Sequence, residues 1–323
     1  MINSISYLIP IFNEEENIKN VISRIKKAFS ENRLENFEII FVDDGSRDKS
    51  VEIIKNFIND GLPIKCICLS RNFGHQAALS AGMKYVSNDL IAILDGDLQD
   101  PPEVINNFLP FFEKGYSVVY GVRKKRKEIF YKRFCYSLFY KLLSYLSDIE
   151  IPLDSGDFCC MTNEVVKTLN SLPEQNRFIR GLRSYIGFNQ IGVNYERDSR
   201  QAGEPKYTFR KLFKLASDGI YNFSDRPLKI ATSIGFLISV SSIIVIILLI
   251  IQRIFSIKVF GYSPSDVPGY TSLIISNFFV AGIQLSALGI IGEYISRIFL
   301  ESKKRPSYLV REILQKNNKI TLN

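Results

Sequence analysis

Four acidic residues lie within the stretch AILDGDLQDPPE, directly behind a run of apolar residues. They are Asp95, Asp97, Asp100 and Glu103, in a chain whose formal net charge is +8. Carboxylates at the spacing D-x-D suit a hard divalent cation, Mg²⁺ or Mn²⁺, which keeps some waters and takes further oxygens from the phosphates of a substrate. A lone D-x-D is a weak signal, because it occurs often by chance. The elements around it must show whether other polar groups lie nearby.

Five short apolar runs alternate with amphipathic stretches over the first 120 residues: ISYLI, FEIIFV, IKCICLS, LIAIL and YSVVYG. Continuous β-branched runs that alternate with helices indicate strands buried on both faces of a mostly parallel sheet. In such open sheets, ligands bind outside the carboxyl ends of the strands. The segments that follow the five runs are polar: PIFNEEEN, DDGSRD, RNFGHQ, DGDLQD and GVRKKR. The D-x-D is therefore expected at one rim of the sheet, beside the acids of DDG.

Several other chemistries are disfavoured by the sequence. It contains neither G-x-G-x-x-G nor G-x-x-x-x-G-K-[ST], which disfavours a dinucleotide oxidoreductase and a P-loop NTPase. The single histidine, His75, makes histidine-based metal cages and Ser-His-Asp schemes unlikely candidates, and we expect it to form a hydrogen bond in a loop or at a helix start. The five cysteines lie in apolar runs and predict reduced packing residues of a cytosolic domain.

Two uncharged stretches predict membrane spans near the C-terminus. The first, Ile230 to Ile251, has twenty-two residues. At about 1.5 Å per residue it forms a helix of about 33 Å, enough to cross a hydrocarbon layer of about 30 Å. The second covers about 270–292. We expect a domain at 1–227, two transmembrane helices within 228–300, and a tail at 301–323.

Lysines and arginines flank the two spans and are sparse in the connector between them. By the positive-inside rule, the N-terminal domain and both termini are cytoplasmic, in a multi-pass protein of the inner (plasma) membrane.

The run RKKRKEIFYKR has seven positive residues in eleven and precedes FCYSLFYKLLSYL. Its aromatic and leucine pattern predicts an amphipathic helix near 129–146 that lies in the membrane interface. Anionic lipids attract such a cluster with about 1 kcal/mol per charge near the surface. A membrane surface is therefore favoured over nucleic acid as the partner of this run.

Several motifs together resemble the family 2 glycosyltransferases of GT-A fold, and among them the polyprenyl-phosphate glycosyltransferases of the bactoprenol glucosyltransferase and dolichyl-phosphate mannosyltransferase type. The motifs are YLIPIFNEEENI, FVDDGSRDKS, SRNFGHQAALSAGM, AILDGDLQDPPE and SRQAGEPKYTFRKL, followed by the two apolar stretches. The resemblance covers nearly the whole chain in order. It implies an α/β fold with a Rossmann-like, mostly parallel sheet, flanking helices, interfacial amphipathic helices and two C-terminal transmembrane helices.

The resemblance also implies roles for individual residues. It assigns to the nucleotide-sugar Pro10, Phe12, Glu14, Asp43, Asp44, Asp95, Arg200 and Lys206. It assigns to the metal Asp95, Asp97 and Gln99. Arg123 and Arg133 fall in the segment that meets the lipid phosphate, and Asp157 in DSGDF matches the catalytic acid. Pro205 departs from the pattern, because relatives commonly have serine there.

Some of these acids have simpler interpretations. Asp43 can cap the turn through Gly45, and Asp100 can cap the helix opened by Pro101, with Glu103 in its first turn. We expect Asp100 to do only that.

The implied reaction moves a hexose, glucose first among the candidates, from a UDP-sugar to undecaprenyl or another polyprenyl phosphate, with a metal and with inversion. The product would serve cell-surface glycan or lipopolysaccharide modification. Asp157 can orient the acceptor, remove a remaining proton or stabilise charge at C1, and these roles stay open. Two alternatives stay open as well: GDP-mannose or a UDP-N-acetylhexosamine as the donor, and a catalytically inactive scaffold that binds nucleotide-sugar. Homo-oligomer formation is also left open. A processive polysaccharide synthase is disfavoured, because the chain has no tryptophan for a Q-x-x-R-W motif.

Overall fold

The computed structural model describes residues 2–123, 155–175, 177–197, 269–316 and 318–321, together with part of 228–255. Contacts divide the chain into two units. One comprises Met1–Gly219 with Lys304–Asn323, and the other comprises Ile220–Lys303.

The first unit is built on a nine-stranded sheet with the strand order β7-β5-β6-β4-β1-β2-β3-β8-β9. Its strands are β1 (Ser4–Ile11), β2 (Asn36–Asp43), β3 (Ile64–Leu69), β4 (Leu90–Ile93), β5 (Val118–Arg123), β6 (Ser155–Thr162), β7 (Gln190–Tyr195), β8 (Val310–Gln315) and β9 (Asn318–Thr321). The four central strands are parallel, since β1 pairs parallel with β2 and β4, and β2 with β3. Antiparallel β6 lies between β4 and β5. The predicted, mostly parallel α/β sheet is confirmed.

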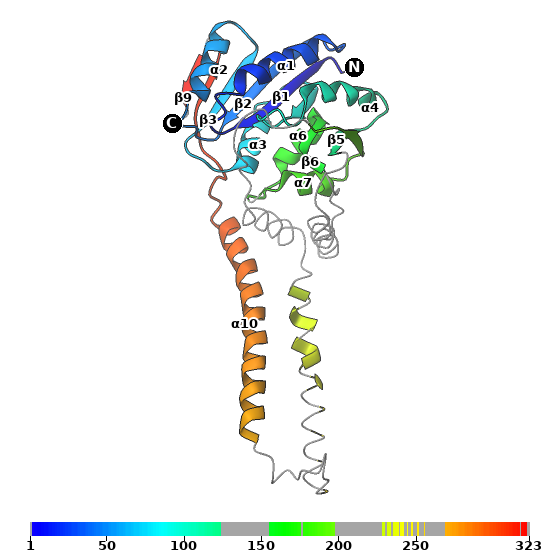
Figure 1. Ribbon diagram of the computed structural model, residues 1–323, viewed down its shortest axis with the longest axis vertical. Coiled ribbons are helices and arrows are strands. Elements are labelled where there is room, and N and C mark those ends of the chain that lie inside the picture. The colour runs from blue at the N-terminus through cyan, green and yellow to red at the C-terminus, as the bar shows by residue number, and fades with distance from the viewer. Residues whose placement is uncertain are drawn as a thin grey trace. The chain divides into compact units, whose positions relative to one another are not determined.

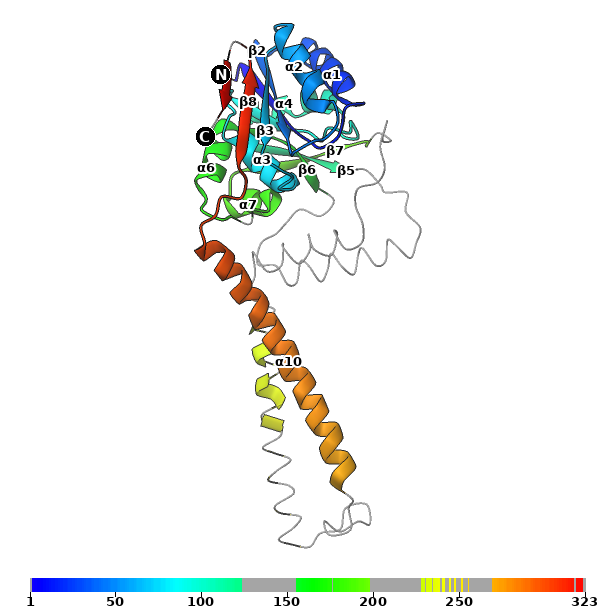
Figure 2. The same cartoon turned by 90° about the vertical axis from the view of Figure 1, so that its left-hand side faces the viewer.

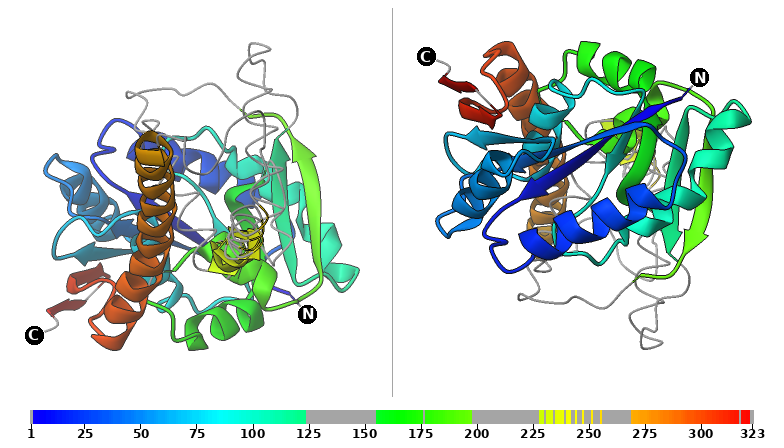
Figure 3. Two further views of the ribbon diagram at one scale, coloured as in Figure 1. Left: turned by 90° about the horizontal axis from the view of Figure 1, so that it is seen from below. Right: turned by 90° about the horizontal axis from the view of Figure 1, so that it is seen from above.

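Helices cover both faces of this sheet (Figures 1 and 2). They are α1 (Ile18–Ser30), α2 (Ser50–Asn59), α3 (His75–Met83), the 3-10 helix η1 (Pro102–Asn107), α4 (Leu109–Glu113), α6 (Asn163–Ser171) and α7 (Ile179–Tyr185). Helices α1 and α2 lie on one side, and α3, α6 and α7 lie on the other, as the second view shows. Figure 3 shows the same layers from below and above.

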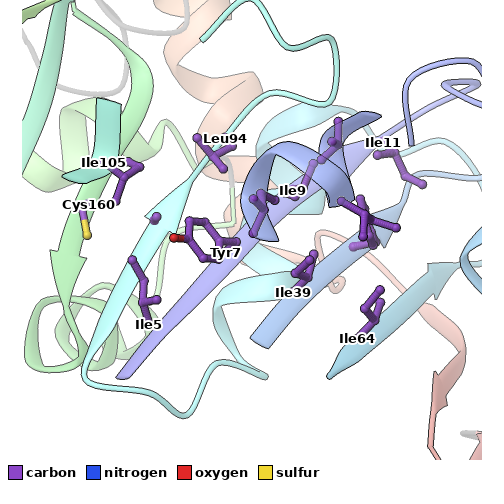
Figure 4. Close-up of a cluster of buried hydrophobic side chains, with 14 of the residues drawn as sticks. Ile5, Tyr7, Ile9, Ile11, Ile39, Ile64, Leu94, Ile105 and Cys160 are labelled. Carbon is purple, nitrogen blue, oxygen red and sulfur yellow. The ribbon is translucent and has the colours of Figure 1, made fainter. Parts of the chain in front are cut away.

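The central strand β1 is buried on both faces, which explains its continuous apolar sequence. Its alternate residues Ile5, Tyr7, Ile9 and Ile11 join the core cluster together with residues of α1 and α2 (Figure 4). The intervening Leu8 faces α3, where a Cβ on Gly82 would lie 2.1 Å from its Cδ1 atom. Helix α3 is therefore held close against the sheet, and this fixes the position of its first residues.

The segment 301–323, expected to be a separate tail, belongs in part to the sheet. β8 pairs antiparallel with β3, and β9 pairs antiparallel with β8. Ile313 and Leu314 of β8 are buried, at 6% and 8% exposed. Without β8, β3 would present a row of unpaired backbone groups at the edge of the sheet, which explains physically why these strands add there. The residues from Lys304 on therefore belong to the first unit instead of forming a separate tail.

In the second unit, helix α10 runs over Gly269–Ser302 and contains the predicted span at 270–292. Its stretch Phe279–Ser302 is the one helix among the described residues that is long and apolar enough to cross a membrane, with a mean hydropathy of 1.4. The first predicted span, 230–251, falls largely outside the described residues and stays a prediction. The interfacial helix near 129–146, Arg133, Arg200 and Lys206 also lie outside them.

Candidate active site

The loops that follow β1 and β2 are tied together by hydrogen bonds at the carboxyl rim of the sheet. The backbone N–H of Asn13 donates to Ser46 Oγ (2.9 Å), and the N–H of Arg47 donates to Asn13 Oδ1 (2.8 Å). Asn13 adopts a left-handed backbone with φ of +53°, a conformation that asparagine accepts more readily than most residues. The next N–H, from Glu14, donates to Ser50 Oγ (3.0 Å). These bonds fix the segment that contains Pro10, Phe12 and Glu14.

The two acids at the end of β2 hold loops in place. Asp44 accepts hydrogen bonds from the N–H groups of Phe73 (2.7 Å) and Gly74 (2.9 Å), directly before α3. Asp43 accepts one from the N–H of Ser46 (3.0 Å), as expected for the cap of a turn. Burial raises the pKa of both carboxyls, although these hydrogen bonds oppose the shift. Asp44 thus fixes the start of α3 and is the structural link between DDG and RNFGHQ.

The D-x-D loop passes close to the end of β1. A Cβ on Gly96 would lie 3.2 Å from Ile11 Cγ2 and 3.4 Å from the carbonyl oxygen of Pro10, so glycine fits best between the two acids. Leu98 has a φ of +59° although it is buried, a strained backbone of the kind found at functional sites. Asp97, only 8% exposed, accepts a hydrogen bond from the N–H of Gln99 (3.1 Å). The loop is therefore rigid, with both acids at the rim.

His75 joins the D-x-D to the acid of DSGDF. Its Nε2 lies 3.3 Å from Asp157 Oδ2 and 3.9 Å from Asp95 Oδ1. The neighbouring Gln76 donates from Nε2 to Asp157 Oδ2 (3.0 Å) and accepts at Oε1 from the N–H of Ile179 in α7 (2.8 Å). One turn at the start of α3 therefore brings together residues that lie far apart in the sequence.

Three pKa shifts follow from this geometry. Burial alone would lower the pKa of His75, but the hydrogen bond to Asp157 and the charges of Asp95 and Asp157 raise it to about 9. Burial raises the pKa of Asp95 to about 6; the charge of His75 opposes the shift, and the carboxylates of Asp100, Asp97 and Asp157 add to it. Burial would also raise the pKa of Asp157, yet the charge of Arg180 and then the hydrogen bond to His75 hold it well below its usual range. Asp157 is thus ionised, whereas burial makes ionisation of Asp95 less favourable.

Asp100 lies at the centre of a buried cluster, and the 3-10 helix η1 that follows it has no side-chain capping hydrogen bond among the described residues. Asp100 is 1% exposed, and its Oδ1 accepts hydrogen bonds from Tyr195 Oη (2.5 Å) and Arg197 Nε (3.2 Å). Arg123 lies 3.7 Å from its Oδ2 and donates from Nε to Tyr195 Oη (3.3 Å). The expectation that Asp100 only caps was wrong, because it is the buried anion of a cluster that ties β5 and β7 to the D-x-D loop. Glu103, in contrast, pairs with Arg24 outside this cluster.

The rim fits a divalent cation in part. Among the described residues, no three His, Cys, Asp or Glu side chains converge as a ligand set of their own. Asp95 and Asp97 nevertheless supply two carboxylates close together at the rim, and burial, with the neighbouring carboxylates adding to it, raises the pKa of Asp95. Mg²⁺ in proteins commonly takes one or two carboxylates, with waters and substrate phosphates completing its shell. The donor set therefore fits a cation that arrives with a phosphorylated substrate.

Comparison with known proteins shows the family of the chain. Residues 6–169 match the family described as Glycosyl transferase family 2. The chain belongs to glycosyl transferase family 2. This member is 42% identical over 315 residues to the uncharacterized glycosyltransferase YkcC of Bacillus subtilis (strain 168), covering 97% of this chain and 95% of the relative. It is 38% identical over 314 residues to the bactoprenol glucosyl transferase of Shigella phage SfV, covering 97% and 99%.

Among solved structures, the family 2 chain is similar to a mannosyltransferase from Pyrobaculum calidifontis in complex with GDP-Man and Mn²⁺. The identity is 13%, the TM-score is 0.46, and the match covers 68% of this chain and 63% of that one.

The sequence predicted that Asp95 and Asp97 lie at one rim of the sheet, and the resemblance assigned the catalytic role to Asp157. In the structure His75 lies between Asp95 and Asp157, and the roles of these acids stay predictions. Four residues near these acids were not predicted, because nothing in the sequence around them indicates a role in the site: Gln76, Arg180, Tyr195 and Arg197. The resemblance also assigned Arg123 to the segment that meets the lipid phosphate, which stays a prediction; the structure places its guanidinium beside Asp100.

Proposed function

We propose that this glycosyltransferase moves glucose from UDP-glucose to a polyprenyl phosphate, such as undecaprenyl phosphate, with inversion at the anomeric carbon. The reaction requires Mg²⁺ or Mn²⁺ and takes place at the cytoplasmic face of the membrane. The product is a polyprenyl-phosphate sugar, a form suited to cell-surface glycan or lipopolysaccharide modification.

One observation carries the choice of substrates. The relative named bactoprenol glucosyl transferase matches 97% of this chain and 99% of its own length, so the similarity includes the C-terminal part as well as the sheet. A soluble acceptor would not require that part. The long apolar helix α10 supports an acceptor that resides in a bilayer, since Phe279–Ser302 is long enough to cross one.

The carboxylates of Asp95 and Asp97 are the side chains suited to hold the cation. A bound cation stabilises the negative charge that develops on the leaving diphosphate. Asp97 is held by the Gln99 N–H, and Gly96 lets this loop approach β1, so the two carboxylates keep a fixed position. Pro10, Phe12 and Glu14 at the end of β1, and Asp44 beyond them, are proposed to line the donor side of the rim.

The acceptor needs little help from a base. A phosphate monoester has a second pKa of about 6 and is largely ionised at neutral pH. One of its oxygens attacks C1 of the sugar, the bond between C1 and the UDP oxygen breaks, and UDP leaves with the electron pair. No proton has to be removed. Asp157, whose pKa is held well below its usual range, is a poor proton acceptor, which supports an orienting role for it.

The membrane arrangement is part of the proposal. Two C-terminal helices at about 230–251 and 270–292 would anchor the chain, and the interfacial segment near 129–146 would meet the lipid surface with Arg133. Arg200 and Lys206 belong to the loop proposed to close over the donor's phosphates. Cysteine-substitution labelling on either side of a membrane vesicle would test this topology.

The donor is tested by a screen. The purified full-length protein is incubated with undecaprenyl phosphate, Mg²⁺ and one of UDP-glucose, UDP-N-acetylglucosamine or GDP-mannose, and the lipid product is identified by mass spectrometry. Transfer from UDP-glucose is expected. Exclusive use of GDP-mannose would overturn the choice of donor, and no transfer from any donor would favour an inactive scaffold.

A further inference from the structure

We infer that Arg180 of α7 binds the phosphate of the acceptor and that Asp157 positions its guanidinium for this contact. The inference rests on the proposed function and adds a specific acceptor-binding residue to it. It adds a contact from α7 to the one that the sequence motif assigned to Arg123.

Arg180 lies beside the acid that the proposed reaction assigns to the acceptor. Arg123 and Arg197 both face the buried carboxylate of Asp100, which offsets only one of their two positive charges. Asp95 and Asp97 are the acids suited to the cation. Asp157 is the acid assigned to the acceptor, and Arg180 Nη2 lies 3.6 Å from its Oδ1.

Arg180 is held in place but is not saturated with hydrogen bonds. Its Nη2 is farther from Asp157 than hydrogen-bond distance, and its Nε is buried without a hydrogen-bond partner in the part of the chain that the structure describes, so the donors left for a ligand are those of the two Nη groups. Arg24 offers a contrast, because it forms two hydrogen bonds to Glu103, at 2.9 and 2.7 Å. The side chains of Arg24 and Arg180 are similarly exposed, at 24% and 21%. Arg180 therefore keeps donor capacity that Arg24 has used.

The position of Arg180 is set by its neighbours. Gln76 connects Asp157 to the backbone N–H of Ile179, the residue immediately before Arg180. The guanidinium also lies over the ring of Phe178, 5.8 Å from its centre. These contacts hold the side chain next to the acid that the proposed reaction needs, on an element independent of the D-x-D loop.

The chemistry suits a phosphate monoester. A guanidinium is always charged and presents planar N–H donors that match phosphate oxygens in pairs. Held beside Asp157 by the attraction of the two charges, it can offer its Nη donors to the acceptor and draw the anionic oxygen toward C1 despite the surrounding carboxylates. A neutral alcohol acceptor would gain little from this contact, so Arg180 also favours a phosphorylated lipid over an unphosphorylated one.

The test compares acceptor and donor kinetics in three variants of the full-length protein, Arg180→Gln, Arg180→Lys and the control Arg24→Gln. Farnesyl phosphate in detergent serves as the acceptor, with UDP-glucose and Mg²⁺. Arg180→Gln should raise the KM for farnesyl phosphate at least tenfold and change the KM for UDP-glucose less than twofold. Arg180→Lys keeps the charge and loses the planar arrangement of donors, so its KM for farnesyl phosphate should lie between the values for Arg180→Gln and wild type. Arg24→Gln should match wild type.

The outcomes separate the inference from the proposed function. If wild type transfers no sugar to a prenyl phosphate from any donor, the proposed function fails. If wild type is active and Arg180→Gln leaves the acceptor KM unchanged, or raises both KM values equally, the inference is overturned. Binding of UDP, measured by calorimetry, verifies that each variant is folded. Should Arg180→Gln not fold, an acceptor KM of wild-type value in Arg180→Lys overturns the inference by itself.

Discussion

Replacing Asp100 by asparagine should destabilise the first unit by about 2–3 kcal/mol. Asp100 is almost completely buried and faces Tyr195, Arg197 and Arg123. Removing one partner of a buried ion pair costs about 3–5 kcal/mol, because the other charge is left uncompensated. Here the side chains of Arg123 and Arg197 are 21% and 31% exposed, so water compensates part of the loss and the lower figure follows.

Thermal unfolding of the detergent-solubilised protein, followed by circular dichroism, measures this change. The chain contains no tryptophan, so tryptophan fluorescence cannot report on it. For a unit of this size, each kcal/mol shifts Tm by about 2–4 °C, so Asp100→Asn should lower Tm by about 4–12 °C. Glu103→Gln is the matched control, because Glu103 lies three positions along the chain in a more exposed ion pair with Arg24.

The cluster can also be separated from simple helix capping. Tyr195→Phe removes the hydroxyl that donates to Asp100, and a double-mutant cycle measures the coupling between the two side chains. A coupling free energy of about 1 kcal/mol or more is expected, since hydrogen bonds to charged groups contribute about 1.5–3 kcal/mol. If Asp100→Asn loses no more stability than Glu103→Gln and shows no coupling to Tyr195, the cluster contributes nothing and Asp100 is only a helix cap.

Further predictions concern the ion pair, the core and the site. Burial would raise the pKa of Glu103, but its hydrogen bonds to Arg24 lower it. Wild type should therefore be more stable than Glu103→Gln by less than about 1 kcal/mol above about pH 4.3, and this difference should be lost as the pH falls below that value. Thermal unfolding at several pH values measures it. Gly82→Ala should destabilise by about 1–2 kcal/mol, because the clash with Leu8 outweighs a gain of about 1 kcal/mol in helix propensity; an unchanged or higher Tm would contradict the packing described for α3. Gln76→Ala should lower kcat for sugar transfer about tenfold while UDP affinity stays unchanged, because Asp157 loses its link to α7; unchanged kcat would contradict a positioning role.

The parallel sheet could be predicted because its signal is local. Each of the central strands is rich in apolar residues, and burial on both faces favours that pattern. The rim followed from the same reasoning, since parallel strands bring their carboxyl ends to one edge. What could not be predicted was the pairing of β8 with β3, because the sequence between them spans most of the chain and carries no motif for it.

The acids of the site illustrate the same limit. Asp97 and Asp157 were identified by motif, whereas the role of Asp100 depends on Tyr195 and Arg197, which come from a strand far along the chain. His75 was expected to form a hydrogen bond at a helix start, and it does lie there, at the first position of α3. That its imidazole faces two carboxylates is set by Asp44, which holds the loop before it. Such contacts depend on three-dimensional packing that no spacing in the sequence encodes.

The most direct test of the proposed site is the metal dependence of sugar transfer in wild type and in Asp97→Asn. Both proteins, purified at full length, are given radiolabelled UDP-glucose and undecaprenyl phosphate, with Mg²⁺, with Mn²⁺ or with EDTA, and labelled lipid is counted. Wild type should transfer glucose only with a cation. Asp97→Asn should lose at least a hundredfold in rate while its Tm stays close to wild type, because losing a charged ligand removes several kcal/mol of transition-state stabilisation. Wild-type turnover by Asp97→Asn, or undiminished transfer in EDTA, would contradict the account.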